Sequence, residues 1–450
     1  MEDLELVEKH VIVPETLLNG RRLFLSNIDL TLVTYLETVS FIEPTSNDIS
    51  FAEICSSFYR SLRRILVSYD FMAGRLIHQA GEGENAGRFE IDCNGEGVVV
   101  VAATTSTSKM SQLGELRCPN KPEFKKLVSF LHNEEWMNLE IKDKPLLLLQ
   151  LTRFQCGGVA LASLSNHCTL DGTAIQEFIV NLASLTRGDD LVIQPNSDRS
   201  IFKARNPPRI SHPHFEYSIP KVSDTSFSIP GSILIPAIIK QPFLKTTTKL
   251  VYLSESWISN LKSLAQRDGK FMKYTTFHVL AAKLWKARSI ATQVPDECIS
   301  TVLFPIDVRR KIVPRAPKGF AGNALIPGFA RSDMNRIKTE KFSALVDEVH
   351  KGVERVDDEY VKSNIDWLEM NRGVPCRENS FSVVVWSKLG FEGVDFGWGR
   401  ITNVVPVEIK PGLVIVLPGD KEGGGIYVCL ELPSEQMEDF YKLMMAKEEE

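Results

Sequence analysis

Residues 163–174, "SLSNHCTLDGTA", stand where an apolar run ends and a helical pattern begins. The run that leads into them, "GVALASLS", is typical of a buried strand. The segment that follows, "GTAIQEFIVNLASLTRG", has apolar residues at helical spacing and predicts a helix that stops at Gly188. His167 therefore lies on a strand-to-helix connection, with Asp171 at or just before the helix N-terminus. Because such connections often carry function, His167 is a candidate catalytic base.

On their own, His167 and Asp171 are a weak signal, because a histidine four residues before an aspartate is common by chance. The structural alternative is a histidine at a strand end and an aspartate that caps a helix. Three features favour catalysis. Histidine transfers protons near neutral pH, Gly172 permits a tight turn, and the pair lies on a connection between two elements.

Strand and helix patterns alternate on both sides of this stretch. Residues from about 187 to 240 differ, because they are rich in Pro, Ser and Asn and show little periodicity, which predicts a long linker. Near the C-terminus, "RITNVVPVEI", "GLVIVLP" and "GIYVCLEL" predict three strands before a helix that starts near Ser434. We therefore predict an α/β protein with a first domain at 1–187, a crossover loop at 188–240 and a second domain at 241–450.

Length and composition fit this organisation. A chain of 450 residues exceeds one ordinary domain, and 43% hydrophobic with 24% charged residues is typical of soluble globular proteins. The net charge of -5 provides no general attraction for nucleic acid. The N-terminal sequence has no secretory pattern, and the apolar runs fall short of the ~20 residues of a membrane-spanning helix. The eight cysteines form no C-x-x-C pair, so we expect reduced thiols in a cytoplasmic protein and no metal site. We also expect a monomer.

A second motif, "DFGWG" at residues 395–399, has the bland interpretation of a loop or bulge whose Trp398 packs into the core. In combination with the motif at His167, however, it resembles the plant BAHD acyltransferase family. Smaller similarities to this family extend along nearly the whole chain: "AGRL" at 73–76, "CNGEGV" at 93–98, "GFAGNAL" at 319–325 and the ending "GDKEGGGIYVCLELPSEQMEDF". The two main motifs occur in the family's order and at its separation.

The resemblance implies two chloramphenicol-acetyltransferase-like domains, each a mixed sheet with helices, joined by the long crossover loop. The first would carry the HxxxD motif, and the second the DFGWG motif and most contacts to coenzyme A. His167 would lie in a tunnel between them, with acyl-CoA entering at one face and the acceptor at the other.

The resemblance also implies roles for single residues. His167 would be the general base of a ternary complex, without a metal, a covalent intermediate or a permanently bound cofactor, and with acyl-CoA as co-substrate. Trp386 would stabilise the oxyanion through its indole N–H, whereas Val384 replaces the Thr of related hydroxycinnamoyl transferases and provides no hydroxyl. Asp171 would pair with a basic residue and hold the loop of His167. The residues that support the site would be Asp171, Gly172, Asp395, Gly397, Trp398 and Gly399.

Two further assignments concern charge and nucleophilicity. Lys286 and Arg309, in basic stretches of the second half, are candidates for binding the phosphates of coenzyme A, with solvated surface charge as the alternative. Cys168 is not expected to act as a nucleophile, because no second histidine lies within sequence reach and the family that the sequence resembles does not use this cysteine.

The acceptor is indicated by the crossover segment "FKARNPPRISHPHFEY", which resembles the branch that acylates omega-hydroxy fatty acids and fatty alcohols. We expect transfer of a hydroxycinnamoyl or aliphatic acyl group to a hydroxyl of such a lipid, or of a phenolic or steroid-like alcohol. An amine acceptor stays open as an alternative. So does a non-catalytic accessory protein of lipid or wax metabolism, against which the intact His167 and DFGWG argue and for which Val384 argues.

Overall fold

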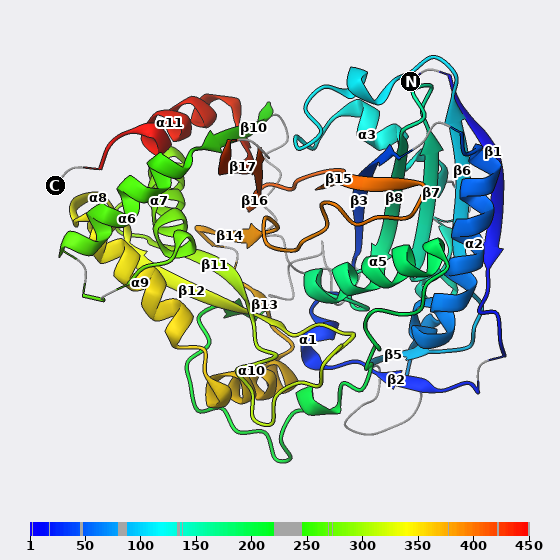
Figure 1. Cartoon of the computed structure of the whole chain (residues 1–450). Helices are drawn as coiled ribbons and strands as arrows, with labels where there is room; N and C mark the ends of the chain where they lie inside the picture. The colour runs from blue at the N-terminus through cyan, green and yellow to red at the C-terminus, as the bar shows by residue number, and fades with distance from the viewer. Residues whose placement is uncertain are drawn as a thin grey trace.

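The computed structural model describes residues 1, 3–17, 19–45, 48–79, 88–132, 136, 138–219, 245–268, 270, 271, 273–376, 378–420 and 423–448. Within these residues the chain forms two α/β units, each with a six-stranded sheet (Figure 1). The predicted fold class is confirmed.

The first unit is built on a mixed sheet in which only β6 and β7 run parallel to each other. Its strand order is β1 (Leu4–Ile12), β6 (Val98–Thr105), β7 (Leu147–Arg153), β8 (Val159–Asn166), β3 (Tyr35–Pro44) and β15 (Gly399–Pro406). A small sheet beside it contains β2 (Arg22–Phe24), β5 (Phe89–Asp92) and β4 (Arg75–His78). Helices α2 (Phe51–Ser68) and α5 (Gly172–Arg187) bury their apolar residues against one face of the large sheet. The first unit also contains short helices, which are α1 (Asn27–Leu30), α3 (Pro122–Lys126) and the 3-10 turns Asp70–Ala73, Met110–Leu113, Ser129–Leu131 and Ile141–Asp143.

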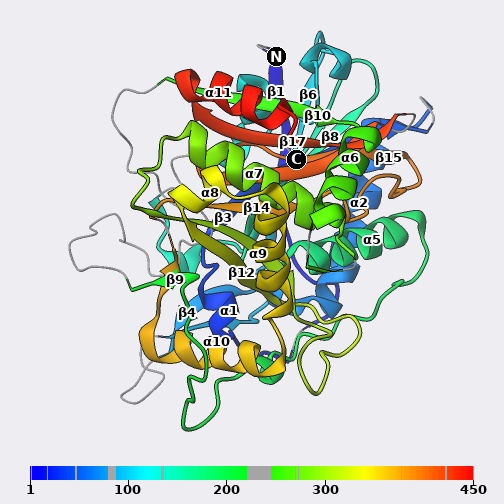
Figure 2. The same cartoon turned by 90° about the vertical axis from the view of Figure 1, so that its left-hand side faces the viewer.

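The second unit repeats the layered arrangement. Its sheet has the order β10 (Thr246–Leu253), β17 (Gly424–Pro433), β16 (Leu413–Asp420), β14 (Ser380–Val385), β11 (Ile299–Asp307) and β12 (Leu325–Asp333). The helices lie on one face of this sheet, as the side view shows (Figure 2); they are α6 (Glu255–Asp268), α7 (Thr276–Ala291), α8 (Met334–Thr339), α9 (Phe342–Glu354) and α11 (Ser434–Met445). The remaining helix, α10 (Asp358–Asn371), lies near α1 of the first unit. No helix in the described ranges has the length and apolar character needed to cross a membrane.

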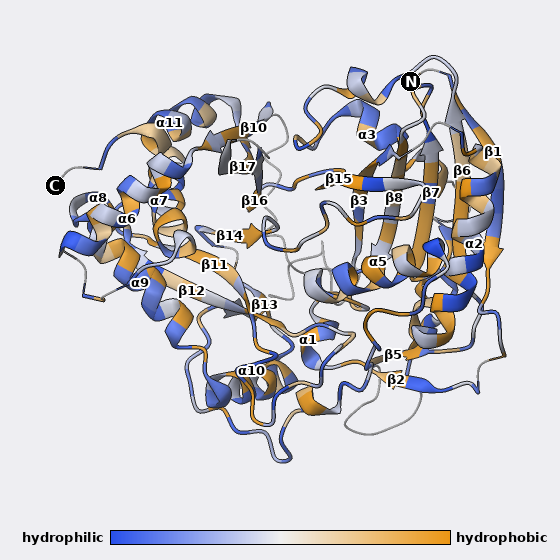
Figure 3. Cartoon of the chain, viewed as in Figure 1, coloured by the Kyte–Doolittle hydropathy of each residue, from blue (hydrophilic) through white to orange (hydrophobic). Residues whose placement is uncertain are grey.

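The elements that carry the opening motif form for local reasons. Strand β7 is hydrophobic along most of its length (Figure 3), and it is buried beside β8, so both strands lie inside the sheet. Helix α5 begins at Asp171, whose side chain accepts a hydrogen bond from the Ala174 N–H, and it ends at Gly188 with a φ of 92°. The connection that holds His167 is therefore fixed at both ends.

The position of β15 corrects the predicted domain boundary. We expected residues 241–450, with DFGWG, to form the second domain, but β15 pairs with β3 from Gly399↔Pro44 to Pro406↔Thr38 and becomes the edge of the first sheet. Figure 1 shows this strand beside β3, whereas the next strand, β16, returns to the second sheet. The physical reason is burial, because Phe396 and Trp398 belong to the apolar core of the first unit.

The predicted crossover loop lies only partly within the described residues, because 220–240 fall outside them. Its described part contains a 3-10 turn (Ser200–Phe202) and β9 (Tyr217–Ser218), which pairs with β13 (Val374–Pro375). Arg205 forms ion pairs with Asp366 at 2.6 Å and Glu359 at 3.0 Å, both on α10. The described part therefore packs on the protein rather than spanning solvent as a bare linker, and Arg205 attaches it to the second unit by ion pairs.

Candidate active site

His167 follows directly on the end of β8, and contacts from both units hold its main chain. The His167 N–H donates to the Thr34 carbonyl at 2.8 Å, and Asn323 Nδ2 donates to the His167 carbonyl at 2.9 Å. The residue is half-buried, and its Nδ1 atom is buried without a hydrogen-bond partner among the described residues. The imidazole is thus presented at a fixed place between the units.

The surroundings keep this imidazole neutral. Burial lowers the pKa of His167, and this effect outweighs the contributions of its own main chain, Asp171, Asn323 and Asp29, which raise the pKa. A neutral ring has a nitrogen lone pair that can accept a proton from a nucleophile. The site therefore meets the first electrostatic requirement for a general base.

Asp171 serves the structure of the site. Its fully buried carboxylate caps α5 and accepts two hydrogen bonds from the Arg309 guanidinium, both 2.9 Å, and a third of 2.9 Å from the Ala324 N–H. Such a two-point pair is geometrically specific, and it joins the connection at His167 to the loop after β11. The basic partner that the family resemblance implies for Asp171 is Arg309.

The positions of Arg309 and Lys286 do not support the predicted phosphate contacts. Besides Asp171, the Arg309 guanidinium binds the Asp307 carboxylate at 3.2 Å and donates to the Gly322 carbonyl at 3.2 Å. Lys286 forms an ion pair of 2.7 Å with Glu448 near the C-terminus. Since both cations have acidic partners within the chain, a structural role is favoured for each, and their contact with coenzyme A stays a prediction.

The reason for glycine at position 172 also differs from the predicted tight turn. A Cβ atom there would lie 3.2 Å from Leu389 Cδ2, in the segment between β14 and DFGWG. Gly172 therefore permits close packing of this segment against the start of α5.

The DFGWG segment is a turn that inserts aromatic residues into the first unit. The Asp395 carboxylate accepts hydrogen bonds from the Gly397 N–H at 2.7 Å and from Arg400 Nε at 3.0 Å. Gly397 has a φ of 87°, a conformation that favours glycine, and a Cβ at Gly399 would lie 2.7 Å from the Glu43 carbonyl oxygen. Each of these residues shapes the turn, and Trp398 is 5% exposed in the core.

Trp386 and Val384 lie at the end of β14. Side chains alternate along a strand, and Phe381 and Val383 pack into the core under the helices. Val384 and Trp386 therefore point to the opposite face of the sheet, where Trp386 packs against Ile409, Ile415, Leu417 and Cys429. In Figure 1 this end of β14 points toward the first unit. Val384 has no polar group, and the Trp386 indole N–H is one of the hydrogen-bond donors at this strand end.

Three buried polar residues around His167 were not found from the sequence. Asp29 on α1 accepts hydrogen bonds from Asn323 Nδ2 at 2.9 Å and from the Asn323 N–H at 3.2 Å. Arg199, from the crossover, lies 3.6 Å from Asp29 and donates to the Thr169 carbonyl at 2.7 Å. Asn323 lies in the family-like segment "GFAGNAL", which was a usable signal, whereas Asp29 and Arg199 stand in no motif.

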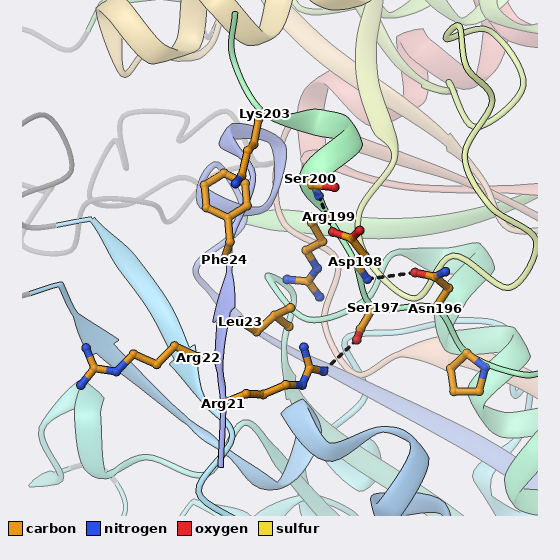
Figure 4. Close-up of a pocket in the computed structure, with 11 residues that line it drawn as sticks. Arg21, Arg22, Leu23, Phe24, Asn196, Ser197, Asp198, Arg199, Ser200 and Lys203 are labelled. Carbon is orange, nitrogen blue, oxygen red and sulfur yellow. Dashed lines mark hydrogen bonds between the residues drawn. The ribbon is translucent and has the colours of Figure 1, made fainter. Parts of the chain in front are cut away.

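Two cavities, of about 450 and 470 Å³, lie along the described part of the crossover. Figure 4 shows the first, in which Arg21 donates to Ser197 at 2.8 Å, and the Asp198 N–H donates to Asn196 at 3.0 Å. Arg21 is also paired with Asp70 at 2.6 Å. Neither cavity is lined by His167, and the tunnel through His167 stays a prediction.

Comparisons with known proteins identify the family and the fold of the chain. The model of the Transferase family matches residues 2–446. "Acyltransferase GLAUCE" of Arabidopsis thaliana is 32% identical over 452 residues, covering 98% of this chain and 95% of that protein. "Fatty alcohol:caffeoyl-CoA acyltransferase" of Arabidopsis thaliana is 31% identical over 94% of this chain and 93% of its own length. The crystal structure of vinorine synthase has the same fold, with a TM-score of 0.73 at 20% identity over 97% of this chain and 96% of its own. Since the family model covers almost the whole sequence, the chain belongs to the Transferase family, the BAHD acyltransferases.

Proposed function

We propose that this protein transfers an acyl group from an acyl-CoA thioester to an acceptor hydroxyl, with His167 as the general base of a ternary complex. Family membership over residues 2–446 supports the reaction. The observation that carries the role of His167 is its half-buried imidazole, which its surroundings keep neutral. The main chain of His167 is bound by Thr34 on one side and by Asn323 on the other. Such fixed placement is what general-base catalysis requires.

The proposed reaction has two steps. As the acceptor oxygen bonds to the thioester carbonyl carbon, its proton passes to Nε2 of His167, and the carbonyl becomes an oxyanion. When this intermediate collapses, the carbon–sulfur bond breaks and the imidazolium returns the proton to the leaving thiolate. The products are an ester and free coenzyme A, and His167 is neutral again. A thioester is already activated, so the enzyme needs mainly to position the two substrates.

For the oxyanion we propose the indole N–H of Trp386 as a hydrogen-bond donor, because Val384 beside it provides none. Loss of one such donor typically lowers kcat by about 10²–10³-fold. Trp386→Phe should therefore lower kcat by this order with little change in the KM of either substrate. Trp257→Phe, on α6 at the outer side of the second sheet, is the matched control and should retain full kcat. A Trp386→Phe enzyme with unchanged kcat would contradict this role.

We propose hydroxycinnamoyl-CoA as the donor and a long-chain alcohol or hydroxy fatty acid as the acceptor. The name of the relative that uses a fatty alcohol and caffeoyl-CoA supports this choice, as does the crossover segment that resembles the same branch. All eight cysteines lie within the described residues and are free thiols, which fits a reducing compartment such as the cytoplasm. We propose that the enzyme acts there as a monomer, and light scattering tests its mass.

The test of the function is an assay of the purified protein with pairs of substrates. Donors are caffeoyl-CoA, feruloyl-CoA and an aliphatic acyl-CoA, and acceptors are fatty alcohols, omega-hydroxy fatty acids, phenolic and steroid alcohols, and an aliphatic amine. We expect thiol release that depends on the acceptor, with an ester product identified by mass. His167→Ala should lower kcat/KM by about 10²–10⁴-fold. His10→Ala, at an exposed position on edge strand β1, is the control and should be fully active.

Other outcomes of this assay would redirect the assignment. An amide as the only product would assign the protein to N-acylation. Absence of thiol release with every pair would favour the accessory protein without catalysis.

A further inference from the structure

A histidine that acts as a general base needs a partner for its second ring nitrogen, because that partner decides which nitrogen carries the proton. The aspartate of the motif does not fill this position. The oxygens of Asp171 bind Arg309, the Ala174 N–H and the Ala324 N–H. Besides the main chain of His167 itself, a partner for the ring must therefore come from another part of the fold.

Asn323 has the required position. Its Nδ2 donates to the His167 carbonyl and to Asp29 Oδ1, each at 2.9 Å. Since both of these atoms are acceptors, they fix the orientation of the amide and leave Oδ1 on its other side. In the described part of the chain, Asn323 Oδ1 and His167 Nδ1 are both buried and both without a hydrogen-bond partner. A buried acceptor and a buried nitrogen that can donate thus occur on two residues already joined by a hydrogen bond.

We propose that Asn323 is a positioning residue that holds His167 in the tautomer with its proton on Nδ1, which donates to Asn323 Oδ1, so that Nε2 keeps the lone pair. The inference deepens the proposed function and rests on it for the role of Nε2. Hydrogen bonds of this kind are often long in a free enzyme and tighten when substrates bind. The proposed acyl-transfer reaction is the same with this hydrogen bond, because Nδ1 keeps its proton while Nε2 accepts and returns the proton of the acceptor hydroxyl.

The way Asn323 is held supports a positioning role. Its partner Asp29 is fully buried and accepts hydrogen bonds from the Ser26 hydroxyl at 2.7 Å and the Ser26 N–H at 2.8 Å. A Cβ at the preceding Gly322 would lie 2.9 Å from Arg199 Nε, so a larger residue there would displace this arrangement. Asn323 itself is 0% exposed, and its amide has little freedom to turn.

The charged and titratable groups near the His167 ring give the sign of the expected pH effect. They are Asp171 and Cys168 on the same connection, Asp29 on α1, Arg199 from the crossover and Arg309 after β11. Burial lowers the pKa of His167, and the contact with Asn323 raises it. Removal of the Asn323 side chain should therefore lower this pKa further and shift the acidic limb of kcat/KM to lower pH.

The experiment reads the tautomer directly by ¹⁵N NMR of the full-length protein labelled at histidine. The His167 signals are identified by their absence from the His167→Ala spectrum. In the wild-type protein at neutral pH we expect Nδ1 to be the protonated nitrogen and Nε2 the unprotonated one. In Asn323→Ala we expect this preference to be lost. Because this readout needs no substrate, it decides the inference even if the acyl-transfer assay fails.

Kinetics and stability complete the test. Asn323→Ala should lower kcat by about 10- to 100-fold with little change in KM, less than the roughly 10⁴-fold loss when a wrong tautomer is enforced in a catalytic triad. Asn364→Ala is the matched control, since Asn364 is also a fully buried asparagine, but its Nδ2 binds Glu216 at 3.0 Å on the side of α10. It should lose stability and keep both kcat per folded protein and the pH profile.

Two results would overturn the inference. One is a wild-type spectrum with the proton on Nε2. The other is an Asn323→Ala enzyme whose kcat per folded protein and pH profile match those of the wild type, because the residue would then serve folding alone. If Asn323→Ala does not fold, Asn323→Ser takes its place in both measurements.

Discussion

At the scale of single residues, the neutral state of His167 has a consequence for pH dependence. Its pKa is lowered below the usual 6.5 by burial, so the base stays unprotonated to lower pH than a free histidine. The acidic limb of kcat/KM should therefore lie below pH 6.5, with activity lost as the pH falls through the pKa of the folded enzyme. The measurement is kcat/KM against pH at saturating acyl-CoA. A limb at or above 6.5 would contradict the buried environment.

Stability needs a separate measurement in the same pH range. Burial also lowers the pKa of His278, to about 4, with a contribution from the neighbouring His350. Because both His167 and His278 bind a proton more readily in the unfolded chain, the folded state loses stability as the pH falls from 6.5 toward 4. Unfolding should be measured at each pH, so that a loss of folded protein is not counted as titration of the base.

The residue scale also shows what a single sequence reveals about a site. His167 could be proposed from residue type, place and motif, because these are local. Arg309 was assigned to phosphate, because a sequence does not show that Asp171, 138 positions away, is its partner. Asn323 and Asp29 become functional candidates only in the folded chain. Asn323 contacts the His167 carbonyl, 156 positions away in the sequence, and Asp29, 294 positions away.

At the scale of elements, the start of α5 depends on the buried pair of Asp171 and Arg309. Removal of one partner leaves a buried charge, which typically costs about 3–5 kcal/mol. Asp171→Asn and Arg309→Met should each lower the free energy of unfolding by this order, measured by urea denaturation. The double variant should lose less than the sum of the two, because no unpaired charge remains.

The control for this prediction is another helix cap without a buried cation. Asp357 caps α10 by accepting a hydrogen bond of 2.8 Å from the Tyr360 N–H. Asp357→Asn keeps a good capping side chain, so we expect a loss of well under about 1 kcal/mol. If Asp171→Asn cost no more than Asp357→Asn, the ion pair would contribute nothing beyond the cap.

Elements were predictable where their signals were local. β8, the connection at His167 and α5 with its stop at Gly188 follow from periodicity and capping within about thirty residues of sequence. β15, the first of the three strands predicted near the C-terminus, was also expected, but the strand with which it pairs was not. Pairing with β3 is decided by register and by the burial of Phe396 and Trp398 in a distant core, neither of which is written in the strand itself.

At the scale of the whole molecule, the two units exchange parts. β15 from the second half of the chain completes the first sheet, and Asn323 and Arg309 reach the connection at His167. A further contact between the units is the ion pair of 2.6 Å between Arg117 of the first unit and Asp420 of β16. Since each unit lacks a part that the other supplies, we expect the chain to unfold in one cooperative transition rather than domain by domain.

This exchange predicts the behaviour of a fragment. Residues 1–187 alone should not form a stable domain, because the edge of β3 is exposed and the core lacks Phe396 and Trp398, two aromatic residues with large buried surfaces. Circular dichroism and urea denaturation should show no cooperative unfolding.

Fusion of residues 391–409 to this fragment through a flexible linker should increase its resistance to protease, because the segment restores the edge strand and both aromatic rings. The same fusion with Phe396→Ser and Trp398→Ser is the control, and it keeps the strand but loses the apolar anchors. A cooperative transition of residues 1–187 without any addition would show that β15 is an accessory of the first sheet, and the coupling of the two units would then rest on contacts such as those of Asn323 and Arg309 near His167 and the ion pair of Arg117 with Asp420.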